Sequence, residues 1–468
     1  MLSYEPLSFD TAADGPRVDW ESGFRLDDVH IAFGLGATLT PRLSDLLDIA
    51  MAAYVTDRLR PRRTPRTRGG DAWSRRLPVR IAVRDAAFWR SREVHGDLHD
   101  LLGWLTDDDW EFEFTSGHQR PRFAESQLSL FSDHPAPGAR FGLFSGGLDS
   151  FLGAARDVAD DDRELVLVSA RTSNPMGAMQ QRTLAALRAA AHARLRGLLV
   201  PIGLRADTIR RLTGRSQAPE ASQRTRGMIF LVLGAVAAVT GGARELRVYE
   251  NGVGAMNLPL TEAQYGSRNT RAMRPETLVM AARLVSRVAE APFSIVNPSF
   301  VRTKAEMCAQ APAAFRDAVT RTVSCDTGLT HRASRVPLCG TCTSCLLRRQ
   351  AMRAAGLRDR DDAEAPRYRV DVRQLDEAGD ERLQRLHYML NQAAQFDRAL
   401  SAADPRRALA QAFPDLRSIR SALDEQGYAD PVGLTEGLLA RYTAEWRGFK
   451  HLLTGRYLPA RGREDLAA

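Results

Sequence analysis

Lysine is nearly absent from this chain. Among 468 residues there are only two, Lys304 and Lys450, so the basic side chains are almost all arginine. Such a skew is typical of genome composition, but it makes a lysine inside a candidate site worth noting. The net charge of +8, from 65 basic and 57 acidic residues, is modest for this length. It therefore gives only weak support for a nucleic-acid partner.

Long hydrophobic runs are also absent. The longest, residues 228–239, falls far short of the roughly 20 residues that a membrane-spanning helix needs. The N-terminus carries acidic residues and scattered aromatics in place of a basic start and an apolar stretch, which predicts no signal peptide. The contents of 44% hydrophobic and 26% charged residues are ordinary for a globular protein. We therefore expect a cytoplasmic protein with no membrane contact.

The regions on either side of the centre of the chain differ in character. Residues 1–135 are predicted to form an α+β accessory domain, because apolar residues alternate at 77–83 and 110–114 as in half-buried strands. The arginine-, proline- and glycine-rich stretch at 58–76 predicts a mobile loop, and both a solvated loop and a contact with RNA or an acidic partner remain open. Residues 126–140 are typical of a linker.

The C-terminal region, residues 366–468, is predicted to be helical, with breaks at Asp404-Pro405 and at residues 427–431. Docking or contact with a partner is its expected role.

The central region, residues 140–358, alternates short apolar runs with helical periods. This pattern predicts an α/β domain with a parallel sheet and helices on both faces. Ligands of such sheets lie beyond the carboxyl ends of the strands. The expected strands are 141–144, 165–169, 198–202, 246–250 and 293–296, and the expected helices are 179–196, 224–240 and 277–289.

A glycine turn joins the first of these strands to a helix. Its residues are Ser145, Gly146, Gly147, Leu148, Asp149 and Ser150. Two successive glycines let the backbone approach an anion closely, and amides at the helix N-terminus point at it. The two serine hydroxyls add donors, and Asp149 can cap the helix or help hold Mg²⁺. A Walker-type Gly-Lys-[Ser/Thr] ending is missing, which disfavours an ATPase that cleaves the γ-phosphate.

This loop, placed between a strand and a helix, resembles that of the PP-loop ATP pyrophosphatases. The resemblance implies a HUP-type fold, as in the adenine nucleotide α-hydrolases. It also implies that ATP is cleaved between its α and β phosphates while the loop holds the pyrophosphate. A substrate carboxylate or base oxygen is adenylated in that reaction.

Four of the five cysteines crowd into a short window, at Cys325, Cys339, Cys342 and Cys345. In a cytosolic chain such crowding predicts a metal site rather than disulfides. Four thiolates supply the closed shell of structural Zn²⁺, and an iron–sulfur cluster is the alternative. Cys308 stands apart and is expected to be a small buried residue.

The SGGLDS loop followed by CGTCTSCLLRR resembles the QueC-type 7-cyano-7-deazaguanine synthases over residues 140–358. That family activates 7-carboxy-7-deazaguanine with ATP and carries zinc on four cysteines, which correspond here to the four named above. Lys304, in TKAE, resembles its lysine–acid segment and is a candidate to stabilise phosphate charge, or else a surface lysine at a helix start.

Further candidates are Arg224 and Arg226, which open a helix and would hold phosphate or carboxylate. Glu250 and Asn251 follow a strand and would hydrogen-bond a purine-like edge, although a plain turn fits them equally.

The chain departs from that family at 169–175 and 250–259, and it is about twice as long. The segments ENG…NLPL and GSRNTR and the extra domains look more like the QueC-like component of Qat anti-phage defence systems, the QatC family. This resemblance implies activation of a deazaguanine-type carboxylate and transfer to an amine, which is either ammonia or a group on a protein partner in a defence complex. The alternatives are a housekeeping synthase of queuosine biosynthesis, an RNA-modifying PP-loop enzyme, and a catalytically silent nucleotide-binding scaffold.

Overall fold

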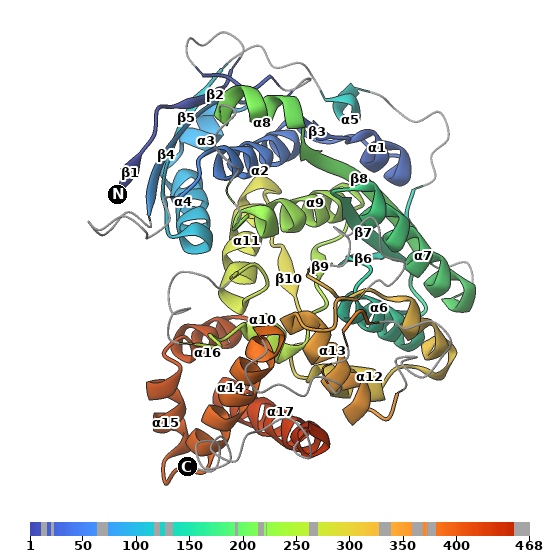
Figure 1. The fold of residues 1–468 in the computed structure, drawn as a ribbon. Helices are drawn as coiled ribbons and strands as arrows, with labels where there is room; N and C mark the ends of the chain where they lie inside the picture. The colour runs from blue at the N-terminus through green and yellow to red at the C-terminus, as the bar shows by residue number, and fades with distance from the viewer. Residues whose placement is uncertain are drawn as a thin grey trace.

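The centre of the molecule is a six-stranded sheet in the order β10-β9-β6-β7-β8-β3 (Figure 1). The computed structural model describes residues 1–10, 16–19, 23–62, 74–116, 122–126, 134–191, 195–213, 220, 222–261, 270–326, 338–357, 368–370, 372 and 381–453. Neighbouring strands are parallel except β3, which pairs antiparallel with β8. The strands are β3 (Phe24–Leu26), β6 (Arg140–Leu143), β7 (Leu165–Arg171), β8 (Leu195–Leu204), β9 (Glu245–Arg247) and β10 (Ser294–Val296). The expected α/β class with a mostly parallel sheet is confirmed.

Helices cover both faces of this sheet, as its sequence predicts. Leu165 and Leu167 of β7 belong to one hydrophobic cluster, whereas Val166 and Val168 belong to another. Successive strand residues point to opposite faces, so both faces of β7 are buried. The first cluster includes α6 (Leu148–Asp160) and α7 (Asn174–Ala191), and the second includes α9 (Arg226–Thr240) and α11 (Pro275–Val288).

Some element boundaries differ from the expected ones. Helix α7 ends at Ala191 rather than at 196, because Leu195 already pairs with Leu165 in the sheet. Strand β9 ends at Arg247, so 248–250 lie beyond the strand, although the Val248 amide still donates to the Val296 carbonyl. Helix α9 begins at Arg226, two residues later than expected.

The N-terminal region contains a second, all-parallel sheet around β4 (Arg75–Ala82). On one edge β4 pairs with β5 (Asp109–Thr115), and on the other with β1 (Leu2–Ser3) and β2 (Leu7–Phe9). The two expected strands are therefore confirmed. The helices of this region are α1 (Val29–Leu35), α2 (Pro41–Leu59), α3 (Ala86–Arg90), α4 (Arg92–Thr106) and α5 (Phe123–Ser126).

The buried helix α2 links this region to the central sheet. It packs against α9, and a single hydrophobic cluster contains residues of α2, α4, α9 and α11. β3 adds a further link, because this N-terminal strand pairs with β8. The boundary near residue 135 remains a prediction. Residues 63–73 of the predicted loop and 127–133 of the predicted linker lie outside the described residues.

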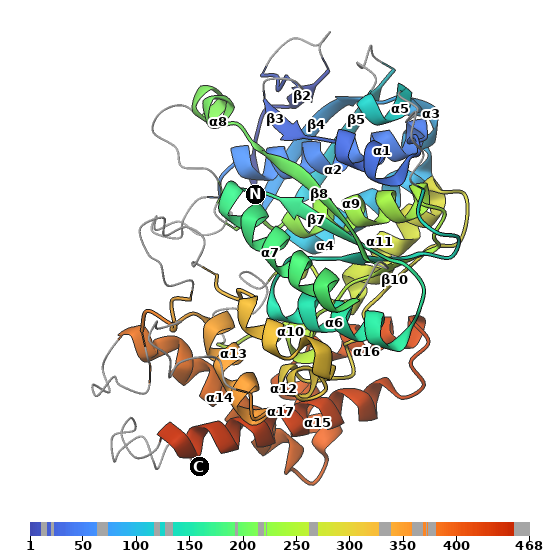
Figure 2. The same ribbon diagram turned by 90° about the vertical axis from the view of Figure 1, so that its right-hand side faces the viewer.

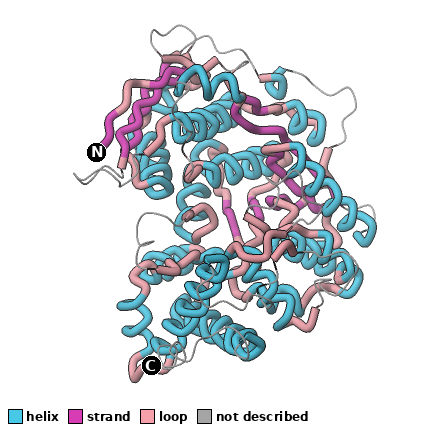
Figure 3. The backbone as a smooth tube through the Cα atoms, viewed as in Figure 1, coloured by secondary structure: helices cyan, strands magenta, loops and turns pink. Residues whose placement is uncertain are grey.

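From Glu381 onward the described part of the C-terminal region consists of helices joined by short turns (Figure 3). Before it, Tyr368 forms an isolated parallel bridge with Leu338. The region contains η5 (Glu381–Leu383), α14 (Gln384–Leu400), α15 (Pro405–Ala412), α16 (Leu416–Glu425) and α17 (Pro431–Leu453). The two predicted breaks are confirmed, and a further break at residues 413–415, between α15 and α16, was not predicted. Its helices and the N-terminal elements lie at opposite ends of the molecule, with the central sheet between them (Figures 1 and 2).

Shorter elements complete the central part of the chain. They are α8 (Ala206–Thr213), α10 (Gly252–Met256), α12 (Lys304–Ala309), α13 (Thr343–Ala354), η2 (Ala313–Phe315) and η3 (Asp317–Arg321). Across the described ranges, every helix is too short or too polar to cross a membrane.

Candidate functional site

The predicted glycine loop connects β6 to the N-terminus of α6. Gly146 adopts a left-handed conformation with φ of +77°, and Gly147 is the extended residue before the helix. Ser145 Oγ lies 3.0 Å from Ser150 Oγ and accepts a hydrogen bond of 3.2 Å from the Gly147 amide. The loop therefore gathers two hydroxyl groups and backbone amides at the first turn of a helix, which is the arrangement that binds anions.

Gly146 is confined by the helix beneath it. A Cβ atom there would lie 2.7 Å from Met179 Sδ and 2.9 Å from Thr183 Oγ1. We expect Gly146→Ala to lower the free energy of unfolding by about 2–4 kcal/mol, because it combines positive φ with overpacking. Gly356→Ala is the matched control, since Gly356 has φ of +67° but nothing within 4 Å of its Cβ position. If urea unfolding shows that both variants lose the same free energy of unfolding, the loop around Gly146 is not crowded.

Asp149 and Lys304, the two predicted catalytic residues, form a buried ion pair. Lys304 Nζ lies 2.9 Å from Asp149 Oδ1, and both side chains are less than a tenth exposed. The other carboxylate oxygen of Asp149 accepts hydrogen bonds from Asn251, at 2.9 Å from its side-chain Nδ2 and 3.3 Å from its amide. The sequence-predicted residues of three separate segments thus meet at the start of α6.

Glu250 completes this polar cluster. Its Oε1 accepts a hydrogen bond of 2.9 Å from Asn251 Nδ2. Burial and the neighbouring Asp149 carboxylate raise the pKa of Glu250 well above its usual value. Burial also acts to raise the pKa of Asp149, but the Lys304 charge and hydrogen bonds from Glu250 and Asn251 outweigh it and lower that pKa to about 2. Asp149 is therefore ionised at neutral pH, whereas the environment of Glu250 favours its protonated form.

This assignment predicts different costs for two similar substitutions. Asp149→Asn should lower the free energy of unfolding at neutral pH by about 2.5 kcal/mol, because the folded carboxylate has a pKa of about 2 against about 3.9 when unfolded. That stability is present above about pH 4 and is lost as the pH falls toward 2. Glu250→Gln mimics the protonated form that burial favours at this position, so we expect a change below about 0.5 kcal/mol. Denaturant unfolding from neutral to acidic pH checks both, and equal losses at neutral pH would contradict the assignment.

A cavity of about 280 Å³ opens beside the loop, at the carboxyl ends of β6, β7 and β9. This is where ligands bind in parallel sheets. Ser145 and Ser150 line it on the loop side, Glu250 lines it after β9, and Arg226 lines it from the start of α9. Most of the remaining wall is apolar, with side chains such as Phe230.

The two arginines that the sequence predicts as ligands have different surroundings in the structure. Arg226 lines the cavity, but Arg224 is absent from its lining and donates to Asp107 at 2.7 Å in the N-terminal region. Helix α9 begins only at Arg226, so the two side chains leave the chain before and at the first helical turn. Arg226 remains a candidate substrate residue, whereas Arg224 connects two parts of the fold.

The four predicted cysteines converge. Their sulfur atoms all lie within 4.8 Å of one another and can hold a metal ion such as zinc. Backbone amides point at the sulfurs: the Cys339 amide donates to Cys325 Sγ at 3.4 Å, and the Cys342 amide to Cys339 Sγ at 3.3 Å. Such bonds stabilise thiolates, so the donor set fits a closed structural zinc site. Cys308 lies apart, buried against Met352, as expected for a packing residue.

The cysteine segment also touches the glycine loop, which the sequence did not predict. Ser324, next to Cys325, accepts a hydrogen bond of 3.0 Å from the Leu148 amide through its hydroxyl. Arg348, buried in the helix after the cysteines, donates to Thr322 Oγ1 at 2.7 Å and so fixes the turn before Ser324. A serine beside a metal ligand has no distinctive sequence pattern, and only the fold reveals its position.

Comparisons with known proteins leave the site to be interpreted from its own geometry. Residues 262–269, which hold most of the GSRNTR segment, lie outside the described residues. No family model matches the chain, and no curated protein sequence matches it.

Proposed function

We propose that this protein is an ATP-dependent enzyme that adenylates a carboxylate of the 7-carboxy-7-deazaguanine type and transfers the acyl group to an amine. The observation that carries the proposal is the meeting of the glycine loop, the Asp149–Lys304 pair and a largely apolar cavity at the carboxyl edge of one parallel sheet. An anion-binding turn and an apolar pocket side by side suit a nucleotide and a flat heterocycle.

The loop side suits the diphosphate that leaves. The amides of Gly147 and Leu148 now donate to the hydroxyls of Ser145 and Ser324, and phosphate oxygens would take over these bonds. Ser150 Oγ, which lies beside Ser145 Oγ, would donate as well. Lys304 brings positive charge to the same helix turn, where it offsets charge that develops on the leaving group. Mg²⁺ on the phosphates would supply further counter-charge, and Asp149 is the carboxylate on the first turn of α6 that suits it.

The cavity side suits the acid to be activated. Arg226 lines the wall and can hold a carboxylate through a charge-assisted hydrogen bond. Glu250, in the protonated form that its raised pKa favours, would offer both a donor and an acceptor to a purine-like edge. The apolar wall, with Phe230 and Met176, would pack against the faces of a heteroaromatic ring.

The proposed reaction has two steps, adenylation of the carboxylate and transfer of the acyl group to the amine. A carboxylate oxygen attacks the α-phosphorus in line, an oxygen–phosphorus bond forms, and the bond to the β-phosphate oxygen breaks so that pyrophosphate leaves into the loop. An amine then attacks the acyl carbon, loses a proton and expels AMP. No protein nucleophile is needed, and the chain's task is to position both substrates and stabilise charge.

The resemblance to the QatC family supports a place in an anti-phage defence system, with either ammonia or a protein amine as acceptor. The terminal regions lie at opposite ends of the molecule and provide surfaces on which a protein acceptor would dock (Figure 2). The four-cysteine site would serve stability, because all four ligands come from protein.

Pyrophosphate and AMP release tests the proposal. The double variant Ser145→Ala/Asp149→Ala should release both products at least about 100-fold more slowly with ATP, Mg²⁺, 7-carboxy-7-deazaguanine and ammonia, because loop contacts and the Lys304 partner are lost together. Normal rates in the variant would contradict it. Mass spectrometry of wild-type protein and candidate partners after the same incubation would identify the acceptor.

A further inference from the structure

Two threonines occupy equivalent places beside the site. Thr225 directly precedes Arg226, which lines the cavity, and Thr303 directly precedes Lys304, which pairs with Asp149. Each threonine stands immediately before the first residue of its helix, α9 or α12, and both are fully buried. The backbone position of the first residue of a helix is restrained by the residue before it, because the two are covalently joined. The contacts of the threonines therefore determine where the two cationic side chains begin.

Thr225 is held by the N-terminal region. Asp57, at the end of α2, accepts hydrogen bonds through Oδ2 from the Thr225 amide at 3.2 Å and from its hydroxyl at 3.0 Å. One carboxylate oxygen thus fixes both the backbone and the side chain of the residue before Arg226. The side chain of Asp57 has no exposed surface, so these bonds form without competition from solvent.

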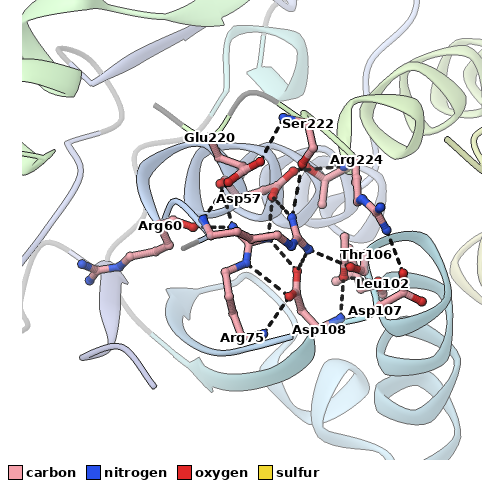
Figure 4. A network of polar contacts seen from close by, with 12 residues as sticks. Asp57, Arg60, Arg75, Leu102, Thr106, Asp107, Asp108, Glu220, Ser222 and Arg224 are labelled. Atoms are coloured by element: carbon pink, nitrogen blue, oxygen red, sulfur yellow. Dashed lines mark hydrogen bonds and ion pairs between the residues drawn. The ribbon is translucent and has the colours of Figure 1, made fainter. Parts of the chain in front are cut away.

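The other oxygen of Asp57 is fixed as well. It lies 2.6 Å from Arg75 Nη2, and the same nitrogen lies 2.6 Å from Asp108 Oδ2 (Figure 4). Arg62 also donates to Asp108, so two arginines and two aspartates balance each other in a buried network. A buried network of this kind has one low-energy arrangement, because displacing any member leaves a charge unpaired.

Thr303 is held by the C-terminal region. Its hydroxyl donates to Glu445 of α17 and accepts from the Glu306 amide at 3.1 Å, so both roles of the hydroxyl are used. The Glu306 carboxylate closes a capping box on the Thr303 amide and pairs at 2.6 Å with Arg441, also of α17. Helix α17 therefore contacts both residues of the capping box, Thr303 and Glu306, at the start of α12.

We propose that Asp57 and Glu445 are positioning residues, through which the two terminal regions place Arg226 and Lys304 at the site. This inference rests on the proposed function, in which Arg226 and Lys304 supply the two positive charges at the site. It assigns the placement of these two side chains to the terminal regions. The N-terminal and C-terminal regions would act in the same way. In each, a carboxylate accepts a hydrogen bond from the threonine that directly precedes the cationic residue.

The N-terminal arm is tested by a double-mutant cycle. Asp57→Asn should lower kcat/KM about 10-fold, mainly by raising KM for the carboxylate substrate, and should change it less than about 2-fold in an Arg226→Ala background. Asp45→Asn is the matched control: Asp45 lies on the same helix, is equally buried and pairs with Arg84 away from Thr225. Its effect should be the same in both backgrounds. Thr225→Val provides a milder variant in case Asp57→Asn fails to fold, and a cycle in which the effects of Asp57 and Arg226 simply multiply would overturn this arm.

The C-terminal arm is tested by lysine reactivity, which needs no turnover. Because Lys450 is the only other lysine, an acylating reagent and mass spectrometry give the modification of Lys304 against an internal standard. Glu445→Ala should raise the Lys304:Lys450 ratio at least about 5-fold, whereas Glu436→Ala on the same helix should leave it unchanged. Equal ratios in the two variants would overturn the proposal.

The two proposals fail in different ways. A wild-type protein that releases no AMP and pyrophosphate contradicts the proposed function. Positioning is then still decided by the lysine ratio and by hydrogen exchange, in which Asp57→Asn should speed exchange of the first amides of α9 and Asp45→Asn should not. If Asp57→Asn leaves the exchange of these α9 amides unchanged, Asp57 has no positioning role, even if the wild-type protein releases AMP and pyrophosphate as proposed.

Discussion

Replacing Lys304 with methionine is expected to slow AMP and pyrophosphate release by about 100- to 1,000-fold, the loss typical of removing one preorganised group that stabilises transition-state charge. Methionine keeps an unbranched side chain of similar length but removes the charge. The ammonium group lies 2.9 Å from the Asp149 carboxylate at the start of α6, where the departing diphosphate would gather negative charge. Product release with ATP, Mg²⁺ and 7-carboxy-7-deazaguanine measures the effect.

Lys450→Met is the natural control, since it removes the chain's other lysine, far along α17. It should leave the rate within about 2-fold of wild type. Lys304→Arg separates charge from shape and should keep part of the activity that Lys304→Met loses. A Lys304→Met variant that folds normally and turns over at the wild-type rate would remove Lys304 from the mechanism.

The second large effect is expected at the cysteines. Cys345→Ala should abolish stoichiometric zinc binding and lower the free energy of unfolding by more than about 4 kcal/mol, because a structural metal contributes directly to folding. Cys345 is fully buried, and Ser324, which directly precedes the cluster cysteine Cys325, contacts the glycine loop. Nucleotide affinity should therefore fall when the metal is lost. Metal analysis, thermal unfolding and nucleotide titration check the three effects.

Cys308→Ala is the matched control, because Cys308 is buried like Cys345 but lies outside the four-sulfur cluster. It should cost stability without changing the zinc content. A brown preparation with iron–sulfur absorption would contradict zinc and support the RNA-modifying alternative. Full zinc retention in Cys345→Ala would contradict the four-ligand site itself.

Local sequence patterns predicted the parts of the fold that local forces determine. The loop at 145–150 follows a strand and opens a helix, because two glycines and a helix start specify that turn whatever surrounds them. The apolar runs of the central strands are long enough to show that both faces are buried. The cysteine spacing likewise determined which four sulfurs converge.

The remainder depends on contacts between distant segments. Nothing near Phe24–Leu26 marks β3 as the antiparallel edge of the central sheet, because its partner lies in β8. Arg224 and Arg226 are alike in sequence, and the fold distinguishes them: Arg224 pairs with Asp107, whereas Arg226 lines the cavity. Asp57, Ser324 and Glu445 meet the site from far along the chain, so their roles are visible only once the chain is folded.

The most direct test is the structure of the protein with Mg²⁺ and a non-hydrolysable ATP analogue. We expect the β- and γ-phosphates to lie against the amides of Gly147 and Leu148, the α-phosphorus to face the cavity, and Lys304 to lie beside the oxygen that bridges the α- and β-phosphates. A nucleotide bound elsewhere in the molecule, with residues 145–150 making no contact to phosphate, would contradict this expectation.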